Sequence, residues 1–148
     1  ALMAFGNRAD GSFVRLSQGK ESPRAIFWGA YDRSALIRLP IVARNAEGRQ
    51  IAPETVEFRL PDGSAHPYLL LAGVAQAMLE GRSTVGLDAL LAATSAERAK
   101  GGPGSATPIP RRPAEVGEAL AASRGVLESG GVFPDVLIEA VLSQLVDR

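Results

Sequence analysis

The chain has 148 residues, 46% of them hydrophobic, which is enough for the core of one ordinary domain and too many for a disordered chain. Its 16 Lys and Arg residues balance its 16 Asp and Glu residues, so the zero net charge argues against a general nucleic-acid binder. The absence of Cys excludes disulfides, thiolate chemistry and zinc–thiolate sites, and it fits a reducing compartment.

Neither the apolar runs nor the first residues indicate a membrane protein. The longest apolar run, at about residues 67–79, is too short to span a bilayer. The first residues lack the basic start and apolar stretch of a signal peptide, so we expect no membrane partner. Residues 1–5 read as the end of a helix, and no initiator Met opens the chain. We therefore expect a fragment that lacks its N-terminal part.

The first third of the chain alternates polar loops with short apolar strands. The pattern predicts polar loops at 6–11 and 17–23, a buried strand at 25–30, a turn at 31–34, a strand at 34–43 and a hairpin loop at 44–53. Arg38 lies inside the second strand, where a buried cation needs a fixed anionic partner. Arg33 can converge with Arg38 only if Arg33 lies in the turn or a bulge intervenes, because a spacing of five residues puts them on opposite strand faces.

A strand at residues 55–62 is the stretch around which the chain is organised. Its alternation predicts a core face formed by Val56, Phe58 and Leu60. Glu57 and Arg59 then become neighbours on the opposite face. The residues leave two interpretations open: a salt-bridged solvent face of an antiparallel sheet, or a half-buried charged face that engages a ligand or a metal.

The second half of the chain is predicted to be mainly helical. Helical stretches are expected at 67–80, 83–100, 113–123 and from residue 135 onward, with a turn at 124–129 capped by Gly130 and Gly131. The helix at 67–80 is apolar nearly all round, which predicts burial. His66 precedes it and is expected to be a turn or capping residue rather than a metal ligand. The Gly- and Pro-rich loop at 101–110 is not a P-loop, because no Gly-Lys-Ser/Thr follows.

Several segments resemble motifs of the glutamine synthetases, in the same order and at similar spacing. Residues 15–23 (RLSQGKESP) resemble the flap segment Arg-Leu-x-x-Gly-x-Glu-x-Pro. Residues 32–40 (DRSALIRLP) resemble Asn-Arg-Ser-x-x-Ile-Arg-x-Pro. Residues 57–62 (EFRLPD) and 65–69 (AHPYL) are similar to Glu-x-Arg-x-Pro-Asp and Ala-Asn-Pro-Tyr-Leu, and residues 130–133 (GGVF) also fit. The resemblance covers the C-terminal part of the catalytic domain of that family.

The resemblance implies a role for each matched charged residue. Arg15 would bind the substrate glutamate, and Glu21 would be the flap carboxylate that helps take a proton from ammonium. Arg33 and Arg38 would hold ATP phosphates and the transferred phosphoryl group. Glu57 would be a ligand of Mg²⁺ or Mn²⁺, and Arg59 would engage glutamate and the phosphoryl group. Planar guanidinium groups suit this task because they grip phosphate and carboxylate through two parallel hydrogen bonds. Of these residues, the expected catalytic ones are Glu21, Arg38 and Arg59.

The resemblance also implies a fold and a function. We expect an α+β fold in which helices cover one face of an antiparallel sheet, with the flap and sheet in residues 1–65 and a helical part in residues 66–148. The full-length parent would be an ATP-dependent glutamate–ammonia ligase that forms glutamine through γ-glutamyl phosphate. It would be a cytoplasmic homo-oligomeric ring of nitrogen metabolism, and the fragment alone would be inactive.

Departures from the family pattern leave two other hypotheses open. Thr55 stands where the family usually has an Arg for nucleotide phosphates, and Asp32 replaces the usual Asn. Both changes weaken a phosphate clamp, as in a degenerate paralogue that serves as a binding or regulatory module. Lys20 replaces an aromatic residue of the flap, and this leaves open a ligase for another amine, such as a polyamine or ethanolamine.

Overall fold

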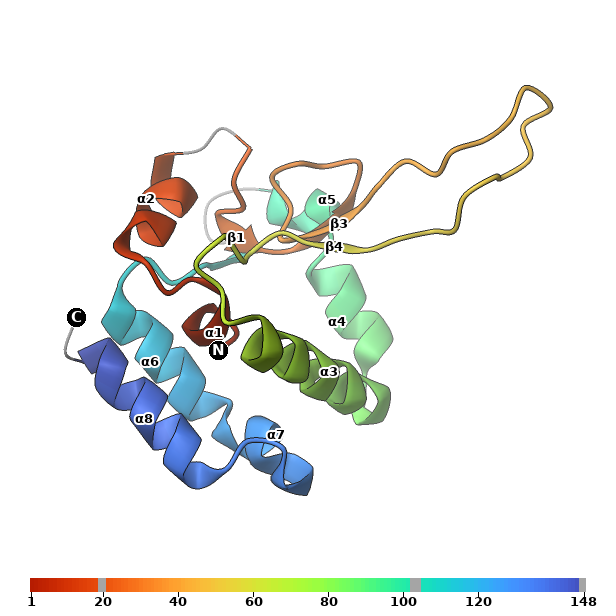
Figure 1. Ribbon diagram of the computed structural model, residues 1–148. Coiled ribbons are helices and arrows are strands. Elements are labelled where there is room, and N and C mark those ends of the chain that lie inside the picture. The colour runs from red at the N-terminus through yellow and green to blue at the C-terminus, as the bar shows by residue number, and fades with distance from the viewer. Residues whose placement is uncertain (19–20, 102–104, 147–148) are drawn as a thin grey trace. The chain divides into compact units, whose positions relative to one another are not determined.

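The computed structural model describes residues 1–18, 21–101 and 105–146 (Figure 1). Two compact units form, each assembled from separate stretches of the sequence. The first unit contains Ala1–Arg15, Leu60–Leu87 and Pro110–Arg148, and the second contains Leu16–Arg59 and Asp88–Ile109. Each unit therefore depends on contacts between residues that are distant in the sequence.

The first unit is helical. Its helices are α1 (Met3–Gly6), the beginning of α2 (Asp10–Gln18), α3 (Pro67–Ser83), α6 (Pro113–Ala122), α7 (Arg124–Glu128), the short 3₁₀-helix η1 (Ser129–Gly131) and α8 (Asp135–Val146). The predicted helices at 67–80, at 113–123 and from residue 135 are therefore confirmed. The polar loop expected at 6–11 ends earlier, because α2 begins at Asp10.

An aromatic pair lies at the centre of this unit. The rings of Phe5 and Phe133 stack with centroids 5.2 Å apart, and both side chains are buried. Val116 and Leu120 of α6 and Ile138 of α8 belong to the same core, where the two helices lie side by side (Figure 1). These side chains follow the spacing of one face of a helix, so their burial accounts for most of the stability of this packing.

Helix α3 has the predicted position but not the predicted burial. His66 is its N-cap, as expected, and its Nδ1 accepts a hydrogen bond from the backbone N–H of Leu69 at 3.4 Å. The helix buries Gly73 and Gln76 and packs on α1 and α7. Its other side exposes apolar residues: Tyr68 is 80% exposed, Leu71 66% and Met78 68%. The expectation of all-round burial is wrong, because the helix finds packing partners on one side.

The second unit contains the strands. They are β1 (Ala25–Ile26), β2 (Trp28–Ala30), β3 (Ile37–Leu39), β4 (Glu57–Phe58) and β5 (Thr107–Pro108), joined by most of α4 (Leu87–Ala93) and by α5 (Ala96–Ala99). Antiparallel pairing joins β1 to β5 and β3 to β4, whereas β2 and β3 are parallel. The α+β fold is confirmed, with mixed pairing in the three-stranded sheet.

The strands are shorter than the apolar pattern predicts. Pairing between β3 and β4 covers only two residue pairs, Ile37 with Phe58 and Arg38 with Glu57. Beyond them the connection continues as a long extended hairpin (Figure 1), which closes with a bridge between residues 44 and 50. Leu60 is buried as predicted, but Val56 is 66% exposed, so its assignment to the core face is wrong. Val56 lies just outside the paired segment of β4, beside an open apolar pocket that it lines together with Ile37 and Leu39 of β3.

Within the described ranges, no helix is both long and apolar enough to cross a bilayer.

Candidate functional site

The turn after β2 holds Arg33 against the carboxylate of Glu21. Arg33 Nη1 donates a hydrogen bond to Glu21 Oε1 at 2.7 Å, and both side chains are exposed to solvent. The hydrogen bond and the charge of Arg33 lower the pKa of Glu21, and the same contact raises the pKa of Arg33. The position of Arg33 in a turn is the first of the two arrangements that permit convergence with Arg38.

The pairing of β3 with β4 places Arg38 directly opposite Glu57. Arg38 Nη1 lies 3.3 Å from Glu57 Oε2, and Arg59 Nε lies 3.7 Å from the same oxygen. The side chains of Arg38 and Arg59 are 22% and 19% exposed, against 42% for Glu57. The prediction that Glu57 and Arg59 are same-face neighbours is confirmed, because two residues that alternate on one strand share a face.

The two groups of charges join through Glu21. Arg59 Nη2 donates to the backbone oxygen of Glu21 at 2.9 Å, while Arg33 binds the carboxylate of the same residue. The charges of Arg59 and Arg38 add to the lowering of the Glu21 pKa. We call these five residues the charged cluster of the second unit: Glu21, Arg33, Arg38, Glu57 and Arg59.

The charged cluster has the chemistry of an anion site. It holds three guanidinium groups against two carboxylates, so a bound anion would meet a net positive charge. Arg38 Nε is buried and has no hydrogen-bond partner among the described residues. A buried donor without a partner is costly, which is a condition that functional sites tolerate more often than structural ones.

Arg15, the sixth predicted site residue, belongs to the first unit. Its Nη2 donates to the backbone oxygen of Leu60 and lies 3.4 Å from the backbone oxygen of Pro61. The guanidinium group therefore holds the chain just before the turn at Asp62. Gly19 and Lys20 of the flap-like motif lie outside the described residues.

The acidic residues do not form a complete metal site. Over residues 1–18, 21–101 and 105–146, no three His, Cys, Asp or Glu residues gather closely enough to hold a metal ion. Glu57 supplies one carboxylate, whose Oε2 already faces two guanidinium groups. A divalent cation requires more oxygen ligands than this residue provides.

A further ion pair beside Arg33 was not predicted from the sequence. Lys100 Nζ lies 2.6 Å from Asp32 Oδ2, while Asp32 Oδ1 accepts hydrogen bonds from the backbone N–H and the hydroxyl of Ser34 at 2.9 and 2.7 Å. Burial alone would raise the pKa of Asp32, but the Lys100 and Ser34 contacts outweigh it and lower the pKa to about 2. Asp32-x-Ser34 is recognisable as a turn motif, whereas no local signal connects Lys100 to it.

A hollow of about 1350 Å³ in the second unit lies beside this ion pair, and Arg33 is the one member of the charged cluster among its lining residues in the described part of the chain. Asp32, Arg33 and Lys100 line it together with Trp28 and Tyr31. Tyr31 has a φ of 61°, a left-handed backbone conformation that residues other than Gly rarely adopt. The turn therefore has an unusual backbone shape at the edge of the hollow.

Comparison with known proteins supplies the family. The family described as glutamine synthetase, catalytic domain, matches residues 1–144. Glutamine synthetase of Mycobacterium bovis is 32% identical over 147 residues, and that of Salmonella typhimurium 34% over 151; each alignment covers 97% of this chain and 29% of the relative. Glutamine synthetase of Thermococcus kodakarensis is 46% identical over 81 residues, which cover 55% of this chain and 17% of the relative.

The chain therefore belongs to the glutamine synthetase family. It spans 29% of the length of the bacterial relatives with which it aligns almost completely.

Proposed function

We propose that the chain is the C-terminal part of the catalytic domain of an ATP-dependent glutamate–ammonia ligase. The charged cluster is the observation that carries this proposal. Its residues come from the segment after α2, from the turn after β2, from β3, from β4 and from the residue that follows β4. They meet although up to 38 residues separate hydrogen-bonded partners. Family membership supports the ligase class, and the cluster supports the step in which a phosphoryl group moves.

The reaction requires charge neutralisation more than covalent help from the protein. The γ-phosphoryl group of ATP would pass to the side-chain carboxylate of glutamate, giving ADP and γ-glutamyl phosphate. Ammonia would then attack the acyl carbon and release phosphate. Because phosphoryl transfer is catalysed mainly by positioning and electrostatic stabilisation, guanidinium groups at the transferred group are the expected machinery.

We assign the guanidinium groups by their position in the cluster. Arg38 and Arg59 are largely shielded from water, so their charges act strongly on a nearby phosphoryl group. Arg33 is exposed in its turn, which suits contact with the phosphates of ATP. Arg59 would also engage the glutamate side chain. A glutamate-binding role for Arg15 is supported by the motif resemblance and not by its position, since its guanidinium group holds the backbone oxygen of Leu60.

Glu21 is proposed as the base that helps ammonium lose its proton. The Arg33 contact lowers its pKa, so the carboxylate is ionised at neutral pH and can attract the ammonium cation. By the family resemblance, Glu21 belongs to a flap segment that would exclude water, which would otherwise hydrolyse γ-glutamyl phosphate.

A divalent cation, Mg²⁺ or Mn²⁺, would supply further neutralisation of the ATP charge. Glu57 would be one of its ligands, and the other ligands would come from parts of the longer protein. The described residues alone do not complete a metal site. The family resemblance further supports a homo-oligomeric ring, a cytoplasmic location and a role in nitrogen metabolism for the full-length protein.

Two other functions keep specific support. Thr55 is exposed at the position of the usual family Arg, which favours a degenerate paralogue acting as a binding or regulatory module. Asp32, the other departure from the family pattern, does not favour this paralogue, because its pairing with Lys100 neutralises the carboxylate next to Arg33. A ligase that uses another amine would keep the same cluster, because the cluster acts on the phosphoryl group and not on the amine.

The test is turnover by the full-length protein that contains this chain. With ATP, glutamate, ammonium and Mg²⁺ we expect phosphate release that depends on every substrate, and no turnover by the 148-residue chain alone. A panel in which ammonium is replaced by a polyamine or ethanolamine identifies the amine. Absence of ATP hydrolysis with every amine would overturn the ligase proposal in favour of the degenerate paralogue.

A further inference from the structure

Asp32 and Arg33 are adjacent residues of opposite charge in the turn after β2, and each has its own partner outside the turn. Asp32 binds Lys100 at 2.6 Å, and Arg33 binds Glu21 at 2.7 Å. Asp32 is also the better shielded of the two, with 14% of its side chain exposed against 62% for Arg33. The turn thus keeps its carboxylate inward and paired with Lys100, and its guanidinium outward, where it is exposed to solvent and paired with the equally exposed Glu21.

We propose that Asp32 and Lys100 form a positioning pair that keeps Arg33 available to a phosphate ligand. This inference rests on the proposed function, in which Arg33 contacts the phosphates of ATP. Lys100 does not touch the ligand in this proposal. It acts through Asp32, by neutralising a carboxylate that would otherwise repel the phosphates and compete for the adjacent guanidinium.

The common hollow explains why the pair matters for an anion. Asp32, Arg33 and Lys100 all line it, so a phosphate group bound by Arg33 lies within the field of the other two charges. A paired carboxylate contributes little net field, whereas an unpaired one at the same place opposes every negative charge of the ligand. Loss of Lys100 is therefore expected to weaken binding even though Arg33 is intact.

The two oxygens of Asp32 separate its structural role from its charge. Oδ1 accepts both hydrogen bonds from Ser34, which shape the turn, and Oδ2 faces Lys100. An Asn side chain offers the same oxygen acceptor to Ser34 but carries no charge. In an Asp32→Asn background the turn keeps its hydrogen bonds and no longer needs a neutralising cation.

The test is a double-mutant cycle in the full-length protein, with the ATP dissociation constant measured by equilibrium binding and with KM and kcat measured separately. Lys100→Met should weaken ATP binding roughly fivefold, as expected for a partly exposed ion pair beside a multiply charged ligand, and raise KM more than it lowers kcat. Asp32→Asn combined with Lys100→Met should restore the dissociation constant to within about twofold, and Lys100→Arg alone should retain it.

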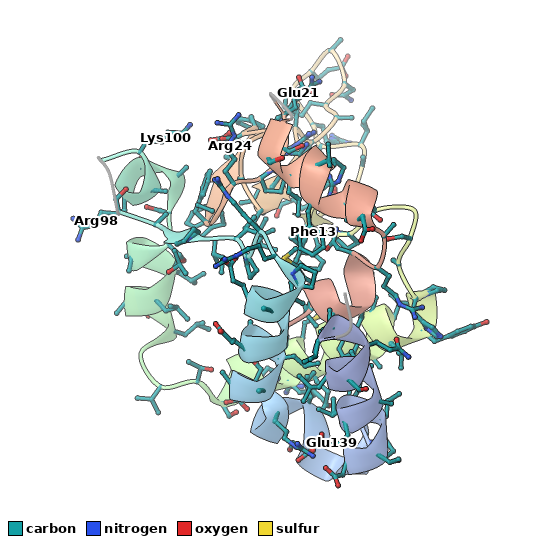
Figure 2. The ribbon with its side chains drawn as sticks, turned by 90° about the vertical axis from the view of Figure 1, so that its left-hand side faces the viewer. Phe13, Glu21, Arg24, Arg98, Lys100 and Glu139 are labelled. Atoms are coloured by element: carbon teal, nitrogen blue, oxygen red, sulfur yellow. The ribbon has the colours of Figure 1, made fainter. Side chains whose placement is uncertain are left out.

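Arg98 provides the matched control. It is exposed, lines the same hollow and leaves α5 in a different direction from Lys100 (Figure 2). Among the described residues it forms no ion pair with Asp32. Arg98→Met should change ATP binding by less than twofold if the pair matters, and as much as Lys100→Met if only the total positive charge of the hollow matters, which would overturn the proposal.

Two further outcomes distinguish this inference from the proposed function. If Arg33→Lys weakens ATP binding while Lys100→Met does not, or if Lys100→Met has the same effect with and without the Asp32→Asn substitution, the positioning pair is wrong and the phosphate role of Arg33 stands. If Arg33→Lys leaves ATP binding unchanged, the phosphate role itself fails, and the pair loses its purpose. Thermal melting of each variant shows whether it folds.

Discussion

The carboxylate of Asp62 stabilises the first unit through several hydrogen bonds. Its Oδ1 accepts hydrogen bonds from the backbone N–H and hydroxyl of Ser64 at 2.8 and 2.6 Å, and its Oδ2 accepts one from Asn7 at 3.2 Å. Burial opposes the charged form, but the bonds from Ser12, Ser64 and Asn7 outweigh it and lower the pKa to about 2. The ionised carboxylate therefore joins the turn to the segment after α1.

The lowered pKa sets the direction of a pH dependence. Because the folded value lies below the unfolded value of 3.8, the stabilisation is present above about pH 5 and is lost as pH falls toward 2. We expect Asp62→Asn to lower the free energy of unfolding by on the order of 1 kcal/mol at pH 7, after allowance for solvent screening, and by almost nothing at pH 2. Urea unfolding at several pH values measures this difference.

An aspartate outside such a network provides the control for this pH series. Asp88 is exposed on α4, and Asp88→Asn should change the free energy of unfolding by less than about 0.5 kcal/mol across the same range. If Asp62→Asn lowers the free energy of unfolding by as much at pH 2 as at pH 7, the side chain stabilises the turn without its charge.

Single residues were predictable where a local rule decides the outcome. The pairing of Glu57 with Arg59 follows from the two-residue period of a strand, and the capping by His66 follows from its place before Pro67 at a helix start. Lys100 pairs with Asp32 across a long stretch of chain, and nothing in the residues around either one indicates the other. Contacts of this kind depend on the tertiary fold, which periodicity does not specify.

Among the elements, the short 3₁₀-helix η1 depends on the backbone conformation of its two glycines. Gly130 and Gly131 have φ values of 67° and 72°, in the left-handed region that costs other residues energy. A Cβ atom at Gly130 would meet no atom within 4 Å, so strain and not collision determines the effect of a substitution there. We expect Gly130→Ala to lower the free energy of unfolding by about 1 kcal/mol.

A second glycine tests the same change without the strain. Gly81 lies inside α3, where a Cβ atom also finds open space and φ is not positive. Gly81→Ala should raise the free energy of unfolding by roughly 0.5–1 kcal/mol, because Ala favours the helix and restricts the unfolded chain. Denaturant unfolding of both variants should give opposite signs, and equal signs would refute the conformational explanation.

Element positions were more predictable than element burial. The helices α3, α6 and α8 lie where the hydrophobic period puts them, and the hairpin loop lies within the polar stretch at 44–53. Strand length and the exposed side of α3 were not predicted, because both depend on which neighbours are available to pair or pack. The parallel pairing of β2 with β3 is likewise a property of the connection between them and not of either strand.

At the scale of the whole chain, exposed apolar side chains predict self-association. Tyr68, Leu71 and Met78 lie on one side of α3, and exposed clusters of this kind favour contact with other molecules. We expect the 148-residue chain to associate with rising concentration in light scattering, and Leu71→Glu to reduce this. Val85→Glu, at an exposed residue that follows α3, should have a smaller effect. A monomer at high concentration would count against the prediction.

Neutralisation of a transferred phosphoryl group by the charged cluster is tested most directly by kinetics of the full-length protein. Arg59→Lys keeps the charge but removes the planar fork, whereas Arg44→Lys makes the same change in the hairpin, where Arg44 binds the backbone oxygen of Gly48 at 2.9 Å. We predict that Arg59→Lys lowers kcat/KM for glutamate-dependent phosphate release on the order of 100-fold without a change in melting temperature, and that Arg44→Lys lowers it less than about twofold. Equal activity of the two variants would contradict this role of the cluster.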